Sequence, residues 1–215
     1  MQAKHYSVEE ERINIISHAV GLLLSIFALP LLVVRASQHG GILALVSFGI
    51  FGTSLIILYT ASTFYHRTKN PRLRNRLRVF DHASIYVLIA GTYTPFSLIT
   101  LNGPTGWAIF SASWGMAFSG IVLKLFFTGK YNLASTLMYV LMGWIIIFAI
   151  KPLMDNLTSS GLIWLFVGGM AYTIGAALYS IKKIKFNHAV FHIFVLIGSF
   201  SHFVSVYFYL LPTIP

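Results

Sequence analysis

Seven long apolar runs set what this chain can fold into. Each is about 20 residues long, the length at which an α-helix crosses the hydrocarbon core of a bilayer. The runs lie at residues 13–34, 42–65, 80–101, 105–127, 132–150, 160–181 and 188–211. A backbone in lipid must satisfy its own hydrogen bonds, and runs of this length favour helices as the way to do so. The sequence therefore predicts an all-α membrane protein, a single seven-transmembrane helix bundle over residues 1–215.

The composition agrees with this fold and excludes several kinds of site. Charged residues make up only 9% of the chain, whereas soluble domains carry about 25%. There is no cysteine, so disulfides, thiolate metal sites and cysteine nucleophiles are excluded. In a soluble protein the net charge of +10 would suggest nucleic acid. Here we interpret it as a topology signal and an attraction to anionic lipid, with membrane lipids as partners and no nucleic acid.

The segments between the runs carry turn or charge residues, as expected of loops. These breaks are residues 38–41, 66–78, 102–104, 128–131, 151–159 and 182–187. The first twelve residues hold three glutamates and no basic n-region. We therefore expect the first run to be a retained span and not a cleaved signal peptide.

Lysine and arginine are distributed very unequally between the two sides of this topology. Of the 15 basic residues, all except Arg35 and Lys151 lie in the N-terminal segment or in or close beside the second, fourth and sixth loops. The positive-inside rule then predicts a cytoplasmic N-terminus and an extracytoplasmic C-terminus. We expect the chain to be a multi-pass protein of the plasma membrane.

Ionisable side chains gather at the predicted cytoplasmic ends of three runs. His66 ends the second run, Asp81 opens the third, and His188 and His192 open the seventh. Residues four apart lie about one helical turn from each other, so the last two histidines share a face. Ionisable groups within spans are costly and commonly functional. The spans and the orientation therefore bring three histidines and one aspartate to one membrane depth.

Three imidazoles are a complete protein ligand set for a catalytic zinc ion. Such an ion lowers the pKa of a bound water to about 7, and Asp81 is placed to orient or deprotonate that water. Ser62, one turn deeper than His66, is placed to hold Asp81 or to donate to a developing oxyanion. The alternative is that these groups are interfacial polar caps that pair with lipid headgroups and the basic second loop.

Three further histidines have other interpretations. His202 shares the phase of His192 but lies about 15 Å beyond it, too far to share one ion, and is expected to hydrogen-bond within the bundle or line a cavity. His18 has the correct depth for a fourth group, although its stripe of small residues favours a packing face. His82 follows Asp81 by 100° and is expected to point away from it, toward the interface.

Five stretches of the chain resemble the haemolysin III proteins of bacteria, within the wider progestin and adiponectin receptor superfamily. They are EERINIISHAVG (residues 10–21), ASTFYH (61–66), FDHASIYVLIAGTYTPF (80–96), NHAVFH (187–192) and SHF (201–203). The resemblance runs nearly end to end. It implies a seven-helix fold with the N-terminus inside and a zinc ion near the cytoplasmic leaflet. By motif position the ligands would be His66, His188 and His192, with Asp81 acting through a water and Ser62 beside them.

Two functions follow as hypotheses. The first is a zinc-dependent hydrolase of a membrane lipid amide or ester, because receptor members of the superfamily resemble lipid hydrolases, with ceramidase activity proposed for them. The second is a non-enzymatic lipid sensor or receptor, or a cytolytic (haemolytic) protein, with a structural zinc. A lytic pore is disfavoured because the deep halves of the second to sixth runs hold only scattered serine, threonine and tyrosine. A proton-coupled transporter is disfavoured because no second intramembrane carboxylate continues a relay from Asp81.

Overall fold

The structure, a computed structural model, describes residues 6–127 and 132–211. Its helices, in chain order, are α1 (Val8–His39), α2 (Gly41–Arg67), α3 (Pro71–Pro95), the π-helical turn η1 (Phe96–Leu101), α4 (Gly103–Phe127), α5 (Asn132–Gly143), the 3₁₀ turn η2 (Ile145–Ala149), α6 (Ile150–Asn156), α7 (Ser159–Ser180) and α8 (Asn187–Tyr209). Across these described ranges there are seven helical stretches long and apolar enough to cross a membrane, and no strand. The predicted seven-span helical fold is confirmed.

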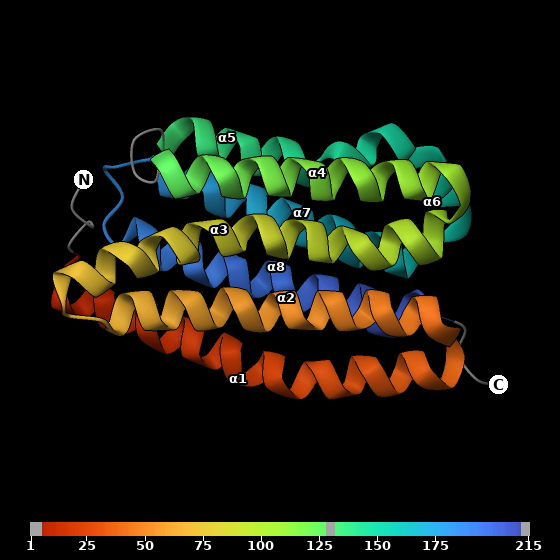
Figure 1. Cartoon of the computed structure of the whole chain (residues 1–215), viewed down its shortest axis with the longest axis horizontal. Helices are drawn as coiled ribbons and strands as arrows, with labels where there is room; N and C mark the ends of the chain where they lie inside the picture. The colour runs from red at the N-terminus through yellow and green to blue at the C-terminus, as the bar shows by residue number, and fades with distance from the viewer. Residues whose placement is uncertain (1–5, 128–131, 212–215) are drawn as a thin grey trace.

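The helices run along the long axis of the molecule, with the two chain ends at opposite ends of the bundle (Figure 1). The helix α1 packs against α2 and α8, and α8 packs in turn against α7. On the other side α3 packs between α2 and α4. The most deeply buried spans are α3 and α8. The two central helices are therefore the ones that carry Asp81, His188 and His192.

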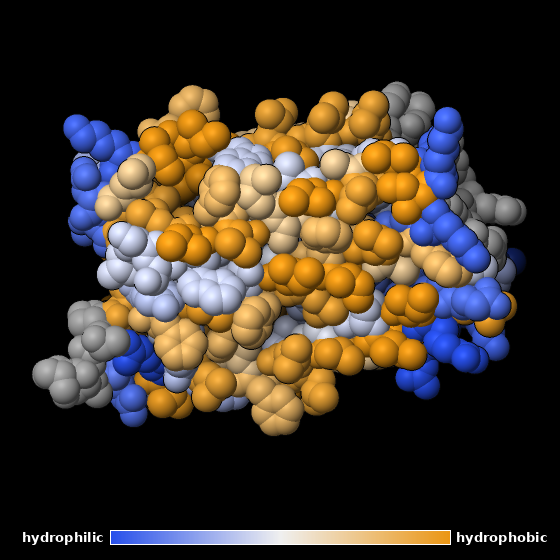
Figure 2. Space-filling view, turned by 180° about the vertical axis from the view of Figure 1, so that it is seen from behind, coloured by the Kyte–Doolittle hydropathy of each residue, from blue (hydrophilic) through white to orange (hydrophobic). Residues whose placement is uncertain are grey.

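The outer faces of the bundle are apolar. Phe27, Phe118 and Phe148 are 63%, 71% and 88% exposed. On the face shown in Figure 2, hydrophobic side chains cover the middle of the molecule and hydrophilic ones gather at its two ends. So much exposed apolar surface is unfavourable in water and suits a hydrocarbon environment. The chain is a multi-pass membrane protein.

A stripe of small and polar residues lets α1 approach its neighbours closely. Asn14, Ser17 and Ser25 on this stripe are all buried. At Gly21 an added Cβ would lie 2.5 Å from Cε1 of Tyr59 on α2, so only a residue without a side chain fits there. This close packing brings the first turns of α1 to the ends of α2 and α8, where the candidate histidines lie.

Helix α3 starts earlier than the sequence analysis predicted. Residues 71–78, expected to be part of a loop, form its first turns. The side chain of Asn70 accepts hydrogen bonds from the amides of Arg72 and Leu73 at 3.0 and 3.1 Å, and Pro71 occupies the first turn, where its missing N–H is not needed. The sequence analysis missed these capping residues because the many arginines of this segment are typical of a loop.

Of the remaining breaks, the one predicted at residues 151–159 is wrong over most of its length, because α6 continues to Asn156 and α7 begins at Ser159. Asn102 and Gly103 adopt positive φ angles of 37° and 51°, which turns the chain sharply between η1 and α4. The fifth span is not one continuous helix, because η2 separates α5 from α6. The predicted break at residues 128–131 lies outside the described residues.

Candidate metal centre

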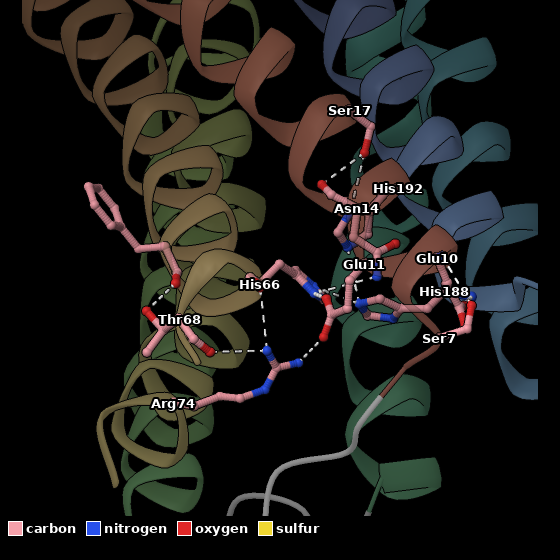
Figure 3. Close-up of polar contacts among 11 residues, drawn as sticks. Ser7, Glu10, Glu11, Asn14, Ser17, His66, Thr68, Arg74, His188 and His192 are labelled. Carbon is pink, nitrogen blue, oxygen red and sulfur yellow. Dashed lines mark hydrogen bonds and ion pairs between the residues drawn. The ribbon is translucent and has the colours of Figure 1, made fainter. Parts of the chain in front are cut away.

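Three buried histidines from two helices converge at one end of the bundle (Figure 3). His66 lies in the last turn of α2, and His188 and His192 lie in the first turns of α8. The Nε2 atom of His188 is 3.1 Å from Nε2 of His66 and 3.1 Å from Nε2 of His192. The structure therefore brings together the three histidines that the sequence analysis selected, with the same ring nitrogen of each turned toward a common point.

The arrangement fits a metal ion. One nitrogen from each of the three rings lies within 4.8 Å of the other two. Zinc–nitrogen bonds of about 2.0 Å at tetrahedral angles place ligand nitrogens about 3.3 Å apart. Imidazole is a common ligand of several transition metals, including zinc, copper, iron and nickel. Three buried histidines that share one centre can hold such an ion.

A carboxylate on α1 orients the first of these rings. Oε2 of Glu11 lies 2.6 Å from Nδ1 of His66. We assign the proton of this ring to Nδ1, because a carboxylate accepts and cannot donate at this distance, and that leaves the Nε2 lone pair for a metal. Oε1 of Glu11 pairs with Nη2 of Arg74, which is buried. Nη1 of Arg74 also donates to the carbonyl oxygens of His66 and Thr68 at 3.4 and 3.2 Å.

Sequence reasoning missed Glu11 and Arg74. A signal for Glu11 was present, because Glu11, Asn14 and His18 lie within about 60° of one helical face, so the polar stripe of α1 continues back to the carboxylate. Arg74 carried no such signal. It is one of six basic residues from Arg67 to Arg78, and only its contacts with Glu11 on α1 and with the end of α2 distinguish it.

Backbone and hydroxyl oxygens of α1 hold the ring of His192. Its Nδ1 atom is 3.3 Å from the carbonyl oxygen of Asn14 and 3.4 Å from Oγ of Ser17. The side-chain amide nitrogen of Asn14 is also 3.4 Å from Nδ1 of His66. One turn of α1 therefore contacts histidines from both α2 and α8, which fixes the two helix ends relative to each other.

Hydrogen bonds from two sides fix the start of α8, which carries His188. The side chain of Asn187 donates to the carbonyl oxygen of Tyr179 at 2.7 Å, and Glu10 accepts from the backbone amide of His188 at 3.3 Å. A carboxylate at a helix N-terminus is stabilised by the helix dipole. The ring of Tyr6 stacks on His188 with centroids 4.7 Å apart. Burial, the main cause, raises the pKa of Tyr6 above its ordinary value, so its phenol stays protonated.

Asp81 and Ser62, which the sequence analysis assigned to the chemistry, are both buried. Oδ2 of Asp81 lies 3.1 Å from Nδ1 of His82. The prediction that His82 points away from Asp81 is wrong. A step of 100° separates the Cβ atoms of adjacent residues, but both side chains turn toward the same interior space. Oγ of Ser62 has no hydrogen-bond partner among the described residues, so it does not hold Asp81.

These groups line one cavity of about 150 Å³. Asp81, Ser62, His188 and His192 all contribute to its wall, and most of the remainder is apolar or aromatic. The cavity extends to His202, whose Nε2 is 3.2 Å from the carbonyl oxygen of Leu165. His202 thus both bonds within the bundle and lines a cavity. A second cavity of about 260 Å³ shares His202 and several neighbouring residues with the first.

Comparison with known proteins identifies the family of the chain. Residues 6–203 match the family described as Haemolysin-III related. The chain belongs to the haemolysin III family. It is 48% identical over 206 residues to the protein named Hemolysin-3 of Bacillus cereus, covering 96% of this chain and 94% of that protein. It is 45% identical over 204 residues to a Hemolysin-3 homolog of Bacillus subtilis, covering 95% and 96%.

A more distant relative extends the likeness beyond bacteria. The chain is 29% identical over 167 residues to the human monocyte to macrophage differentiation factor, covering 75% of this chain and 69% of that protein. The matched family region of residues 6–203 spans every residue of the metal centre, from Tyr6 to His192. The haemolysin III resemblance stated from the sequence motifs is confirmed.

Proposed function

We propose that this haemolysin III protein is a zinc-dependent hydrolase that cleaves an amide or ester bond of a membrane lipid. The observation that carries the proposal is the convergence of three Nε2 atoms beside a cavity that also holds a carboxylate, Asp81, and a hydroxyl, Ser62. In this proposal the protein resides in the plasma membrane with its N-terminus in the cytoplasm, and membrane lipids are its partners.

The zinc ion would be held by His66, His188 and His192. When bound, zinc supplies Lewis acidity to a water molecule and to a carbonyl oxygen. The carboxylate of Asp81 accepts a proton from the attacking water, and the hydroxyl of Ser62 is free to donate a hydrogen bond to the carbonyl oxygen as it gains charge.

The bond changes of this hydrolysis balance without a further reagent. The water oxygen bonds to the acyl carbon, and the C–N or C–O bond of the lipid breaks. The proton that Asp81 takes from the water passes to the leaving nitrogen or oxygen. Nδ1 of His82 lies 3.1 Å from Oδ2 of Asp81, beside the carboxylate that makes this transfer. A buried site also excludes bulk water, which strengthens each of these electrostatic contacts.

The cavity suits a lipid chain. Leu88, Ile89, Val140 and Val195 are part of its wall, and such side chains stabilise a hydrocarbon by removing it from water. His188 and His192 line the part of the cavity at the start of α8, whereas His202 lines it ten residues further along that helix. A lipid with its tail along this wall presents its polar linkage to the histidines, Asp81 and Ser62.

Metal analysis combined with lipid mass spectrometry tests the proposal. Purified wild type is expected to turn over an amide or ester lipid, and Asp81→Asn is expected to retain zinc and lose turnover by about 100-fold or more. His39→Ala, at the opposite end of α1, is the matched control and should change neither property. Turnover by Asp81→Asn at the wild-type rate would remove this carboxylate from the chemistry. Zinc without turnover of any lipid would leave the metal structural.

The names of the two bacterial relatives support a second candidate function. Both are called hemolysins, which suggests a cytolytic membrane protein in which the histidine cluster holds a structural zinc, as it would in a lipid sensor or receptor. Leakage of dye from liposomes distinguishes the candidates. Dye release by the wild type that involves no lipid cleavage, and that persists in His192→Ala, supports lysis independent of the metal centre and contradicts the hydrolase proposal.

A further inference from the structure

One histidine beside the metal centre is used by none of the contacts described so far. His18 on α1 is 3% exposed, and its ring stacks on that of His192 with centroids 3.5 Å apart and planes 9° from parallel. The ring of Tyr59 meets it edge-on at 5.1 Å. Packing on both sides fixes the orientation of the imidazole.

The stacked geometry excludes His18 as a ligand of the same ion. An imidazole binds a metal through a lone pair in its own ring plane, at about 2.0 Å. An ion in the plane of His192 lies about one stacking distance, 3.5 Å, from the parallel plane of His18. No in-plane lone pair of His18 reaches that position. His18 is therefore not a fourth ligand of this ion. A simple packing role does not account for it either, because a packing residue needs no ring nitrogens.

Both ring nitrogens of His18 lack a hydrogen-bond partner among the described residues. Burying a polar atom without a partner costs free energy. His18 lines the same cavity as Ser62, and the hydroxyl of Ser62 is also buried and without a partner in that part of the chain. Two unsatisfied polar side chains, one on α1 and one on α2, thus face the space beside the metal ligands.

We propose that His18 and Ser62 form a polar subsite that binds the hydrogen-bonding group of the lipid directly, beside the metal and without coordinating it. A neutral imidazole offers one donor and one acceptor, and a hydroxyl offers both. The subsite therefore matches a lipid group that both donates and accepts, such as an amide or a hydroxyl, better than an ester, which only accepts. The inference rests on the proposed lipid-binding function and makes His18 a residue that determines specificity.

The test measures zinc content and lipid binding on the full-length protein in lipid nanodiscs. The probes are a fluorescent N-acyl amide, the matching ester and the matching hydrocarbon of equal length. His18→Phe keeps an aromatic ring against His192 and removes both nitrogens, and His18→Gln keeps a donor and an acceptor. We expect both variants to retain zinc. Binding of the amide should fall about tenfold or more in His18→Phe, should be partly restored in His18→Gln, and should not change for the hydrocarbon.

Three results would overturn the subsite. They are loss of zinc in His18→Phe and His18→Gln alike, equal binding of the amide by wild type and both variants, or wild-type binding of the amide no tighter than that of the hydrocarbon. The outcome is separable from that of the hydrolase proposal. Amide binding that depends on His18, in a protein that cleaves no lipid, supports the subsite and refutes hydrolysis. Lipid turnover that does not change when His18 is replaced supports hydrolysis and refutes the subsite.

Discussion

The carboxylate of Glu11 lies 2.6 Å from Nδ1 of His66, on the side of the ring opposite the convergence point of the three histidines. A contact of this kind fixes the tautomer and the direction of a metal ligand. It also links α1 to the end of α2, so the same hydrogen bond contributes to the site and to the packing of the bundle.

Replacing Glu11 should weaken metal binding without removing a ligand. We expect Glu11→Gln to lower zinc affinity by about 10- to 100-fold, the usual effect of losing such a partner, because an amide holds the Nδ1 proton less strongly than a carboxylate. Competition with a chromogenic chelator measures this change. Glu9→Gln, on the exposed face of the same turn, is the control. Equal affinity in the two variants would show that Glu11 does not support the metal.

We expect Arg74 to contribute to the stability of the fold and the exposed basic residues near it in sequence not to do so. Its guanidinium pairs with Glu11 and donates to two carbonyl groups at the end of α2. Removing it leaves those acceptors without a charged donor, and we expect Arg74→Ala to lower the free energy of unfolding by about 2 kcal/mol. Thermal unfolding in detergent provides the measurement. The exposed Arg76, changed to Ala, should have no effect, and an equal loss in both variants would contradict this role.

Much of the fold could be predicted because lipid simplifies the problem. A span must be apolar, about 20 residues long and internally hydrogen-bonded, so hydropathy gives the helices and basic residues give an orientation. The positions of the spans and their orientation then placed His66, His188 and His192 at one depth. Reasoning from helical phase failed for His82, because helical phase gives the direction of the Cα–Cβ bond and not the rotamer of the side chain.

What the sequence could not supply was the set of contacts between helices. Glu11 reaches His66 across 55 positions of sequence, and nothing in the local sequence of either residue encodes that pairing. The start of α3 at Pro71 was missed for a different reason. Its capping residues, Asn70 and Pro71, lie in an arginine-rich stretch of the kind expected in a loop. Arg74 is distinguished from the other arginines only by its contact with Glu11 of α1.

The close contact between α1 and α2 gives a prediction about packing. Gly21→Ala adds a methyl group 2.5 Å from the ring of Tyr59, and the hydroxyl of Tyr59 is held by Ser199 at 2.8 Å, so the ring cannot move away freely. We expect a loss of about 1–3 kcal/mol in stability. Gly49, where an added Cβ meets nothing within 4 Å, is the matched position for comparison. Unfolding midpoints that agree for the two alanine variants would refute the close approach.

The predicted orientation can be tested with single cysteines, because the natural chain has none. Lys69 lies between α2 and α3, and Asn156 lies at the end of α6; both are exposed. If the N-terminus is cytoplasmic, a membrane-impermeant maleimide added to intact cells should label Asn156→Cys and not Lys69→Cys. Inverted vesicles should give the opposite pattern. Labelling of Lys69→Cys in intact cells would reverse the topology.

The zinc content of the purified protein tests the proposed metal centre most directly. Elemental analysis of the wild type should find about one zinc ion per chain, as expected for a site with three histidine ligands. His192→Ala should lose the ion while His39→Ala keeps it. A wild type without metal at neutral pH, or a His192→Ala variant that retains the full complement of zinc, would contradict the assignment of His66, His188 and His192 as the ligands.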